Sequence, residues 1–250
     1  MVPDAGATQA SIDEKAPLKA YLSAEIGENV NLVIPANYNA TIEGLGNGSL
    51  DFAYLGGLSY LKAHKQYDVV PLVQRTDDLS FHTLFICRTN SSIHSLRDLI
   101  GKKFSFGDVN STSGHLMPYM EMRQAGLEPE VQLHTQYSGS HPATAKLVES
   151  GAVEAGALDE TIYNAMVADG KLDVSKVRVF YTSKPFVDYV WVARKGVPAD
   201  VQEKFARAFL NLKQGKDDDV LRLLRGKSYV RARNEEYSIL RAIAQELKML

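Results

Sequence analysis

The sequence predicts an α/β protein made of two lobes of similar design, and two observations support this. Short apolar stretches alternate along the chain with stretches whose apolar residues recur at helical spacing, and such alternation favours largely parallel sheets. In addition, residues 48–53 and 151–156 share one pattern: glycine, small residue, aliphatic residue, acid, any residue, small residue. Each copy marks a helix-to-strand junction. Either the similarity arose by chance, or it predicts two lobes, each with helix N-termini at one edge of its sheet.

The composition is typical of a soluble globular protein. The 250 residues, 45% hydrophobic and 23% charged, suffice for one large domain or for two lobes. A net charge of −2 argues against broad binding of nucleic acid or anionic membranes, which needs a basic face. The single cysteine excludes an internal disulfide and a cysteine-rich metal site.

The beginning of the sequence carries little information about location. No apolar run approaches the ~18 residues of a transmembrane helix, and no secretory signal stands at the start. We interpret residues 1–4 as the end of a strand that enters a turn, with the strand itself cut away. A missing signal therefore says little about where the protein works.

The elements of the first hundred residues follow from periodicity and from turn residues. Leu18 and Leu22 share a helical face, and Pro17 interrupts that pattern. Asn39 or Thr41 is placed to cap a helix. In order, we expect a helix over 8–26, a strand over 30–34, a turn over 35–39, a helix from 40 to 45, a buried strand ending at 55, a helix over 60–67, strands over 69–73 and 83–87, and a helical turn over 95–99.

The alternation continues to the end of the chain. After a strand over 132–137, Ser140 or His141 is placed at a helix cap, and Pro142 takes the favoured first helical position. Further on, we expect a helix ending at 149, a strand within 151–159, a helix over 162–168, strands over 177–181 and 188–194, and helical segments over 200–212, 220–224 and 235–250.

One stretch, residues 104–119, carries the strongest chemical signal. A strand over 103–107 leads into a turn and then into the run Ser111-Thr112-Ser113-Gly114, after which the spacing becomes helical. Such a junction points backbone N–H and side-chain O–H groups at one spot, where the helix dipole adds roughly half a positive charge. This arrangement binds oxyanions. Alternatively, Ser111 or Ser113 merely caps the helix.

Several motifs together resemble the phosphate/phosphite/phosphonate-binding proteins of ABC transporters. The resemblance spans roughly residues 3–193 in the family's order, and its hydroxyl-glycine-histidine motif is its most specific part. The motifs are Tyr54-Leu55-Gly56-Gly57-Leu58-Ser59-Tyr60, Phe106-Gly107-Asp108, Ser111-Thr112-Ser113-Gly114-His115-Leu116, Ser140-His141, Gly156-Ala157-Leu158-Asp159 and Pro185-Phe186-Val187-Asp188-Tyr189.

The resemblance implies the two-lobed periplasmic-binding-protein fold of type II, with a ligand cleft between the lobes and two hinge strands. We expect residues 1–84 and 190–250 to form lobe 1 and residues 85–189 to form lobe 2. The chain would cross between the lobes near 81–88 and return near 185–193. The missing first strand is a departure from the family pattern.

The resemblance also implies a set of ligand-binding residues. Ser111, Thr112 and Ser113, with the following backbone amides from Gly114 onward, would hold the phosphorus-bound oxygens. Tyr54 and His141 would add hydrogen-bond donors. His115, at the start of a helix, is a further candidate donor.

Three acidic residues complete the expected site. Asp188 would accept a hydrogen bond from a P–OH group, which sulfate lacks, unless it is a surface turn residue. Asp159 and Glu160 could pair with the ammonium of an aminoalkylphosphonate, or Asp159 could simply cap the helix that follows. Glu160 is a second departure, since we expect a smaller residue there in members that carry bare phosphite.

The resulting prediction is a binding protein for a small phosphorus oxyanion that delivers its ligand to an ABC permease in the membrane. We expect no catalytic residue, no cofactor, no metal and no nucleic acid, because no nucleophile, cofactor lysine or metal-ligand spacing is visible. We expect a monomer, periplasmic or anchored outside the cytoplasm. The alternatives are an enzyme on the same bilobal fold, such as a pyrimidine- or thiamine-precursor synthase, and a ligand-sensing domain. Which phosphorus oxyanion is preferred stays open.

Overall fold

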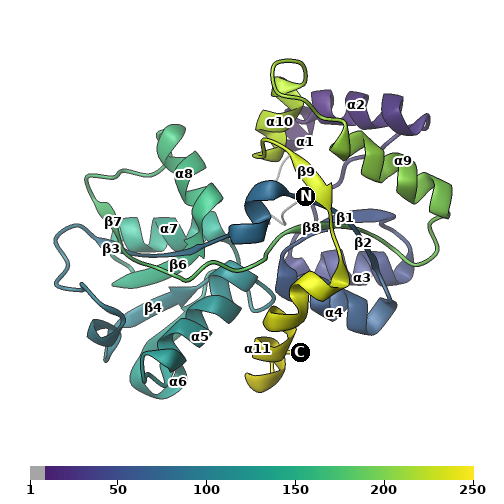
Figure 1. Cartoon of the computed structure of the whole chain (residues 1–250). Coiled ribbons are helices and arrows are strands. Elements are labelled where there is room, and N and C mark those ends of the chain that lie inside the picture. The colour runs from purple at the N-terminus through teal and green to yellow at the C-terminus, as the bar shows by residue number, and fades with distance from the viewer. Residues whose placement is uncertain (1–8) are drawn as a thin grey trace. The chain divides into compact units, whose positions relative to one another are not determined.

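The computed structural model of the protein describes residues 9–250 and divides them into two compact units (Figure 1). Unit 1 takes in the described residues up to Ser80 together with Val187–Arg241, and unit 2 comprises Phe81–Phe186 with Ala242–Leu250. These changeovers lie a few residues from 84/85 and 189/190, where we placed the lobe boundaries; the division into functional lobes stays a prediction. The interpretation of residues 1–4 lies outside the described residues.

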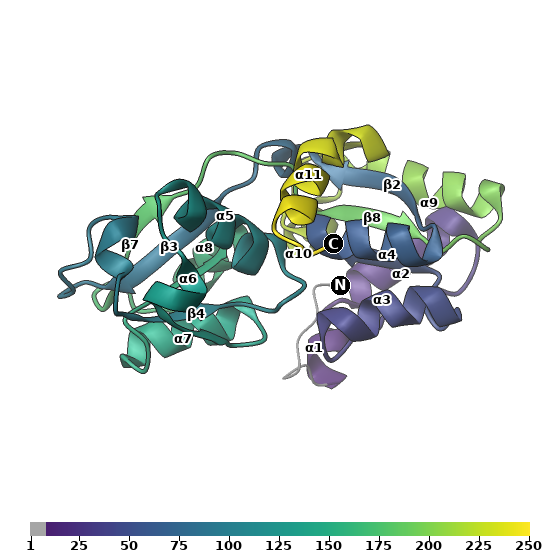
Figure 2. The same cartoon turned by 90° about the horizontal axis from the view of Figure 1, so that it is seen from below.

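Unit 1 is built around a four-stranded sheet in the order β1-β8-β2-β9, in which all neighbours are antiparallel. Helices α3 and α4 lie side by side on one face of it, and α2 and α9 cover the other (Figures 1 and 2). Its elements are α1 (Gln9–Asp13), α2 (Ala16–Ile26), α3 (Tyr38–Asn47), β1 (Phe52–Leu55), α4 (Gly57–Tyr67), β2 (Val70–Arg75), the 3₁₀ turn η1 (Thr76–Ser80), β8 (Val190–Ala193), α9 (Ala199–Leu210), α10 (Asp218–Leu224), β9 (Tyr229–Arg231) and η4 (Asn234–Tyr237). Helix α11 (Ser238–Glu246) follows.

Unit 2 is built around a five-stranded sheet in the order β5-β4-β6-β3-β7. Helix α5 packs on one face, while α7 and α8 pack on the other (Figure 1). Its elements are β3 (Thr83–Arg88), the 3₁₀ turn η2 (Leu96–Leu99), β4 (Lys103–Phe106), a turn of π-helix η3 (Thr112–Leu116), α5 (Met117–Gln124), α6 (Pro129–Gln132), β5 (His134–Tyr137), α7 (His141–Ser150), β6 (Ala155–Asp159), α8 (Glu160–Ala168) and β7 (Val177–Thr182).

The expectation of largely parallel sheets is wrong. Only β5, β4 and β6 are parallel neighbours; β3 runs antiparallel to β6 and β7. In unit 1, β8 lies between β1 and β2 and runs opposite to both. The local alternation of strand and helix predicts the parallel core, but it does not show that β3 and β8 enter their sheets from distant parts of the chain.

The strand expected over 30–34 is also not formed. Its side chains alternate between half-buried and exposed, as in a strand, but the segment is extended chain without a strand partner among the described residues. A strand requires a neighbour with which to exchange backbone hydrogen bonds, and the pattern alone cannot supply one.

The internal echo is confirmed at the level of local structure. Helices α3 and α7 are both 10 residues long. Asn37 caps the first through the N–H of residue 40, and Ser140 caps the second through the N–H of residue 143. Each helix ends at a glycine in the left-handed conformation, Gly48 at φ 81° and Gly151 at φ 79°. Strands β1 and β6 follow, so the two units share an α-β-α segment, with Tyr38 at the first position of α3 and His141 at the first position of α7.

Candidate functional site

The hydroxyl-rich turn begins unit 2's longest continuous helical run. Ser111 has extended backbone geometry, its Oγ accepts the N–H of Gly114 at 3.0 Å, and its carbonyl accepts the N–H of Leu116 at 3.1 Å. The predicted helix cap is therefore confirmed for Ser111. The buried residues Thr112 and Ser113 follow on the π-helical turn, which continues into α5. The first N–H groups of a helix have no partner within it, so this end of the run favours negative charge.

The Ser113 side chain is the most informative single group in the turn. Its hydroxyl oxygen is buried and has no hydrogen-bond partner among the described residues, while the Ser113 carbonyl accepts the hydroxyl of Thr83 at 2.9 Å. Buried polar groups in proteins are nearly always hydrogen-bonded, and leaving one unmet costs about 1–3 kcal/mol. A buried hydroxyl without such a partner, at the start of a helix, indicates a position where an atom of a bound ligand accepts its hydrogen bond.

His141 adds a donor to the same region. It occupies the first turn of α7, is 1% exposed, and its Nδ1 accepts the backbone N–H of Asp159 at 3.2 Å. Because Nδ1 accepts, the neutral ring carries its proton on Nε2 and donates from that side. A Cβ at Gly114 would lie 3.0 Å from Cε1 of His141 and 2.9 Å from Oγ of Ser111. The turn and helix α7 therefore meet at a position where a Cβ would crowd both.

His115 is held through both nitrogens of its ring. Its Nδ1 lies 2.9 Å from the carbonyl of Val109, and its Nε2 lies 2.9 Å from the hydroxyl of Tyr137. The ring is also enclosed by Phe106 and Tyr119. Both ring nitrogens thus help to hold the turn in place, and a role of His115 as a ligand donor stays a prediction.

The two acids at the junction of β6 and α8 are anchored within unit 2. Oδ1 of Asp159 accepts the N–H of Ile162 at 2.8 Å and the hydroxyl of Thr161 at 2.7 Å, so the alternative that Asp159 caps the following helix is confirmed. Oε1 of the half-buried Glu160 accepts the backbone N–H of His82 at 2.9 Å. A pairing of either carboxylate with a ligand ammonium stays a prediction.

In unit 1, Asp188 is fully buried, and the alternative that it is a surface turn residue is wrong. Its Oδ1 accepts the N–H of Gly57, the first residue of α4, at 2.8 Å. Its own N–H donates to the carbonyl of Asp78 at 3.0 Å. A carboxylate is favoured at a helix N-terminus by the dipole and the exposed N–H groups. This explains why a charged group is tolerated here.

Sequence reasoning missed a buried ion pair beside Tyr54. Arg75 is 2% exposed and Asp78 0% exposed. Nε of Arg75 bonds Oδ2 of Asp78 at 2.9 Å and Nη2 bonds Oδ1 at 2.5 Å. Tyr54 donates its hydroxyl to Oδ2 at 3.3 Å and stacks on Tyr189, with ring centroids 4.9 Å apart. The only sequence signal was an arginine three residues before an aspartate at the end of a strand, a spacing that is common on protein surfaces.

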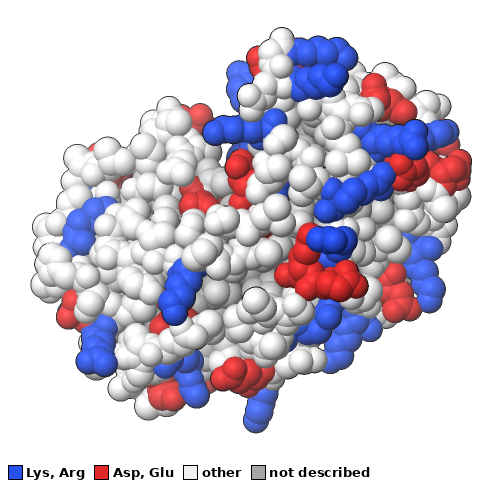
Figure 3. All heavy atoms as spheres, in the orientation of Figure 1, with Lys and Arg blue, Asp and Glu red and all other residues white. Residues whose placement is uncertain are grey.

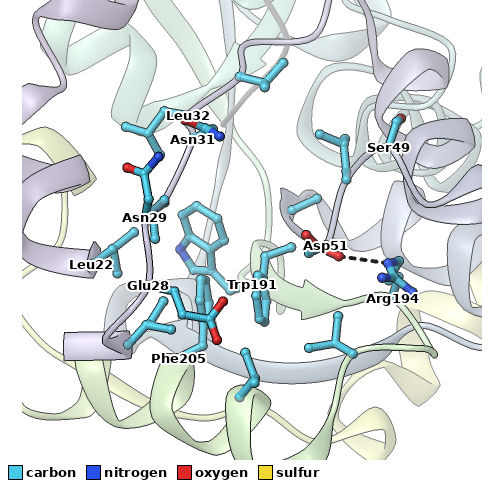
Figure 4. A pocket seen from close by; sticks show the side chains of 18 of the residues that line it. Leu22, Glu28, Asn29, Asn31, Leu32, Ser49, Asp51, Trp191, Arg194 and Phe205 are labelled. Atoms are coloured by element: carbon cyan, nitrogen blue, oxygen red, sulfur yellow. Dashed lines mark hydrogen bonds and ion pairs between the residues drawn. The ribbon is translucent and has the colours of Figure 1, made fainter. Parts of the chain in front are cut away.

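A pocket of about 470 Å³ in unit 1 is not the predicted site (Figure 4). Its walls are the extended residues around Asn29–Leu32 and the start of β1, with Trp191 and Phe205 between them and the Asp51–Arg194 ion pair at one side. None of the ten predicted ligand residues lines it. Size alone therefore does not assign a function to this pocket.

Within residues 9–250, no cluster of three or more His, Cys, Asp or Glu side chains is arranged to hold a metal ion. In the same residues, no helix has the length and apolarity required to cross a membrane.

Two α/β units, with neutral donors at a helix start in one and a buried carboxylate in the other, are the features expected of a solute-binding protein. The chain matches the profile of the family described as "ABC transporter, phosphonate, periplasmic substrate-binding protein" over residues 5–237. It therefore belongs to this family, and its fold is the type II periplasmic-binding-protein fold. Members of the family are transport binding proteins rather than enzymes.

Three comparisons, with two relatives, illustrate the similarity. A probable ABC transporter phosphite binding protein, PhnD1, of Prochlorococcus marinus is 30% identical over 248 residues, which covers 92% of this chain and 82% of the relative. The structure of PhnD1 from that organism in complex with methylphosphonate is 29% identical, with a TM-score of 0.90 and coverage of 100% of this chain and 97% of the other. The phosphate-import protein PhnD of Mycolicibacterium smegmatis is 25% identical over 207 residues, covering 77% of this chain and 64% of the relative.

Proposed function

We propose that this chain binds a small phosphorus oxyanion outside the cytoplasm and delivers it to an ABC importer. The observation that carries the proposal is the buried Ser113 hydroxyl, which has no hydrogen-bond partner among the described residues and lies at the start of a helical run. The phosphite-binding and methylphosphonate-bound relatives support the ligand class. The chain would act as a monomeric binding protein without catalysis, periplasmic or tethered to the membrane, with the permease as its partner.

The donor set in unit 2 would hold the deprotonated oxygens of the ligand. It consists of the hydroxyls of Thr112 and Ser113, the N–H groups at the start of the helical run, and Nε2 of His141. Hydrogen bonds to a charged group are each worth about 1.5–3 kcal/mol. Four to six of them, less the cost of ordering the site, support micromolar or tighter binding. No lysine or arginine is required.

Asp188 would distinguish phosphorus acids from sulfate. An ionised carboxylate only accepts hydrogen bonds, so Asp188 would accept one from a P–OH group. Sulfate has no proton to give at neutral pH and would place its oxygens against the carboxylate. The proposal thus favours a protonated monoanion such as hydrogen phosphonate, methylphosphonate or dihydrogen phosphate.

The organic part of the ligand depends on Glu160. If Glu160 pairs with an ammonium, aminoethylphosphonate will bind more tightly than methylphosphonate. Oε1 of Glu160 already accepts the N–H of His82. A ligand ammonium would therefore pair with the acceptor positions of the carboxylate that this bond leaves. Equal affinities for these two phosphonates would remove the amine role and leave the phosphorus group as the recognised element.

A calorimetric titration with phosphite, phosphate, methylphosphonate, aminoethylphosphonate and sulfate tests the proposal. We expect binding of at least one phosphorus oxyanion and no measurable binding of sulfate. In the variants Ser113→Ala and Thr112→Ala, affinity should fall by about 1–3 kcal/mol, because a ligand oxygen loses its donor.

The matched control is Ser150→Ala, which removes a hydroxyl at the exposed end of α7 and should leave affinity unchanged. Wild-type affinity in both Ser113→Ala and Thr112→Ala would exclude the hydroxyl-rich turn as the site. Equal binding of sulfate would exclude the role of Asp188.

A further inference from the structure

Two backbone carbonyls in the hydroxyl-rich turn are held from outside the helix. The Ser113 carbonyl accepts the hydroxyl of Thr83 at 2.9 Å. The carbonyl of Gly114 accepts the backbone N–H of Gly107 at 2.8 Å. We propose that Thr83 and Pro118 are positioning residues for the ligand: Pro118 withholds the helical N–H from the Ser113 carbonyl, and the Thr83 hydroxyl replaces it and so sets where the Ser113 side chain lies. This inference rests on the proposed function, in which the Ser113 hydroxyl meets a ligand oxygen.

The missing helical donor follows from the register of the turn. In a π-helix each carbonyl accepts the N–H five residues further on, and the Thr112 carbonyl accepts the N–H of Met117 in this way. The next pair would join Ser113 to residue 118, which is a proline and has no N–H. In the four-residue register of an α-helix, residue 118 would instead serve the Gly114 carbonyl, which loses the same donor. Both carbonyls therefore depend on donors outside the helix.

Two strands of unit 2 lead to these donors. Thr83 is the first residue of β3 and is fully buried, and Gly107 directly follows β4. A Cβ on Gly107 would lie 3.3 Å from Cα of Gly114, so the two glycines permit the close approach that the second bond requires. A buried carbonyl without a partner is costly. The turn is therefore held in the orientation in which both carbonyls meet their donors.

Thr83 is itself held in place through its backbone. Its N–H donates to Oγ of Ser183 at 2.9 Å, and its carbonyl accepts the N–H of Ser183 at 3.0 Å. The Thr83 hydroxyl thus reaches the turn from a fixed point of the sheet. Ser113 is anchored through its carbonyl, while its hydroxyl has no hydrogen-bond partner among the described residues. The direction of a carbonyl fixes the backbone rotation of its own residue, so the bond from Thr83 also controls where the Ser113 side chain lies.

Calorimetric titration with methylphosphonate tests the role of Thr83. Thr83→Val removes the hydroxyl at nearly constant shape, and affinity should fall about tenfold, the loss of one well-placed hydrogen bond to a charged ligand. Thr83→Ser retains the hydroxyl and should recover wild-type affinity. The matched control is Thr89→Val, which removes a hydroxyl just beyond the other end of β3 that donates to the carbonyl of Ser175. It should leave affinity unchanged.

A double variant shows whether Thr83 acts through Ser113. Once the Ser113 hydroxyl is absent, its misplacement has no further effect, so Thr83→Val should weaken binding little more in a Ser113→Ala background. Two losses that multiply in full would mean that Thr83 affects binding by another route, and the inference would be overturned.

Pro118→Ala supplies the N–H that the proline withholds. In the Thr83→Val background, this N–H continues the π register and can bond the Ser113 carbonyl, so melting temperature and affinity should both recover. In the wild-type background, where Thr83 already serves that carbonyl, the same substitution should raise neither quantity. Failure to recover in a folded double variant would overturn the role of Pro118.

The outcomes separate the proposed function from this inference. If wild-type protein binds none of methylphosphonate, phosphite and phosphate, the proposed function fails and this inference fails with it. If Ser113→Ala weakens binding but a folded Thr83→Val protein binds as the wild type does, the inference is overturned and the proposed function stands. Should circular dichroism show that Thr83→Val alone does not fold, the double variant with Pro118→Ala decides. Near wild-type affinity then supports the inference, and a loss as large as that of Ser113→Ala overturns it.

Discussion

Gly114 allows the hydroxyl-rich turn to approach helix α7 closely, because glycine has no Cβ. A Cβ there would lie 2.9 Å from Oγ of Ser111, 3.0 Å from Cε1 of His141 and 3.2 Å from the backbone of Gly107. Distances of this size force the neighbours to move, and overpacking of this kind typically costs 1–3 kcal/mol. The residue therefore shapes the candidate site although it contributes no side chain.

We predict that Gly114→Ala lowers both stability and ligand affinity. The free energy of unfolding should fall by about 1–3 kcal/mol, and affinity for methylphosphonate should fall because Ser111 and His141 are displaced together. Denaturant unfolding and calorimetry measure the two effects. Gly196→Ala is the matched control, since a Cβ there meets only the far end of the long Arg194 side chain. Unchanged affinity in a folded Gly114→Ala protein would contradict the prediction that binding depends on how the turn and His141 are placed together.

At the residue scale, the sequence predicts what depends on near neighbours. The caps formed by Ser111 and Asp159 use N–H groups three residues further along the chain, and such contacts are encoded in short motifs. The packing of His115 is not encoded in this way, because its partner Tyr137 lies 22 residues away. The burial of Arg75 depends on Arg225, which is 150 residues away, so nothing near Arg75 distinguishes it from a surface arginine.

At the scale of elements, helix α5 is tied to strand β7 through a buried carboxylate. Glu121 on α5 accepts the hydroxyl of Tyr181 at 2.6 Å and the backbone N–H of Lys184 at 3.0 Å. Burial, and then the hydrogen bond to Glu121, raises the pKa of Tyr181 to about 12. The helix that begins at the proposed oxyanion site is therefore fixed to the segment that leaves unit 2.

This tie predicts a loss of stability at alkaline pH. The pKa of Tyr181 is raised in the folded state above its ordinary value of about 10. The contribution of Tyr181 to the free energy of unfolding is therefore complete below pH 10 and disappears as pH rises towards 12. Burial raises the pKa of Tyr237 in the same direction. Melting temperatures measured from pH 8 to pH 11.5 should be flat at first and then fall. In Tyr181→Phe the fall should be shallower, and an identical profile would show that Tyr181 does not contribute.

The elements themselves were predicted better than their order in the sheets. The helices and strands around the two echoed segments are present, because capping residues and αL glycines act locally. The antiparallel course of β3 and β8 was missed, because each pairs with strands that lie far away in sequence: β3 with β6 and β7, and β8 with β1 and β2. A repeating pattern of strand and helix does not show that a strand pairs with another strand far away in the sequence.

At the scale of the whole molecule, the charge distribution fits a site that works by hydrogen bonds. The net charge is −2, and on the face drawn in Figure 3 acidic and basic side chains are interspersed rather than gathered into a basic field. An anion is therefore not attracted over long distances. The proposed binding energy comes from short, buried dipoles in unit 2.

The affinity for a phosphorus oxyanion should therefore depend only weakly on ionic strength. Salt screens interactions between exposed charges beyond roughly 10 Å at 0.1 M, while buried hydrogen bonds are screened much less. We expect the dissociation constant for methylphosphonate to change by less than about threefold between 20 and 500 mM NaCl, a weak dependence that follows from the same screening argument. A parallel series in sodium gluconate controls for competition by chloride, and Ser113→Ala should lose the same factor at every salt concentration. A loss of more than tenfold across the series would mean that positive side chains attract the ligand, and the neutral donor set would no longer account for binding.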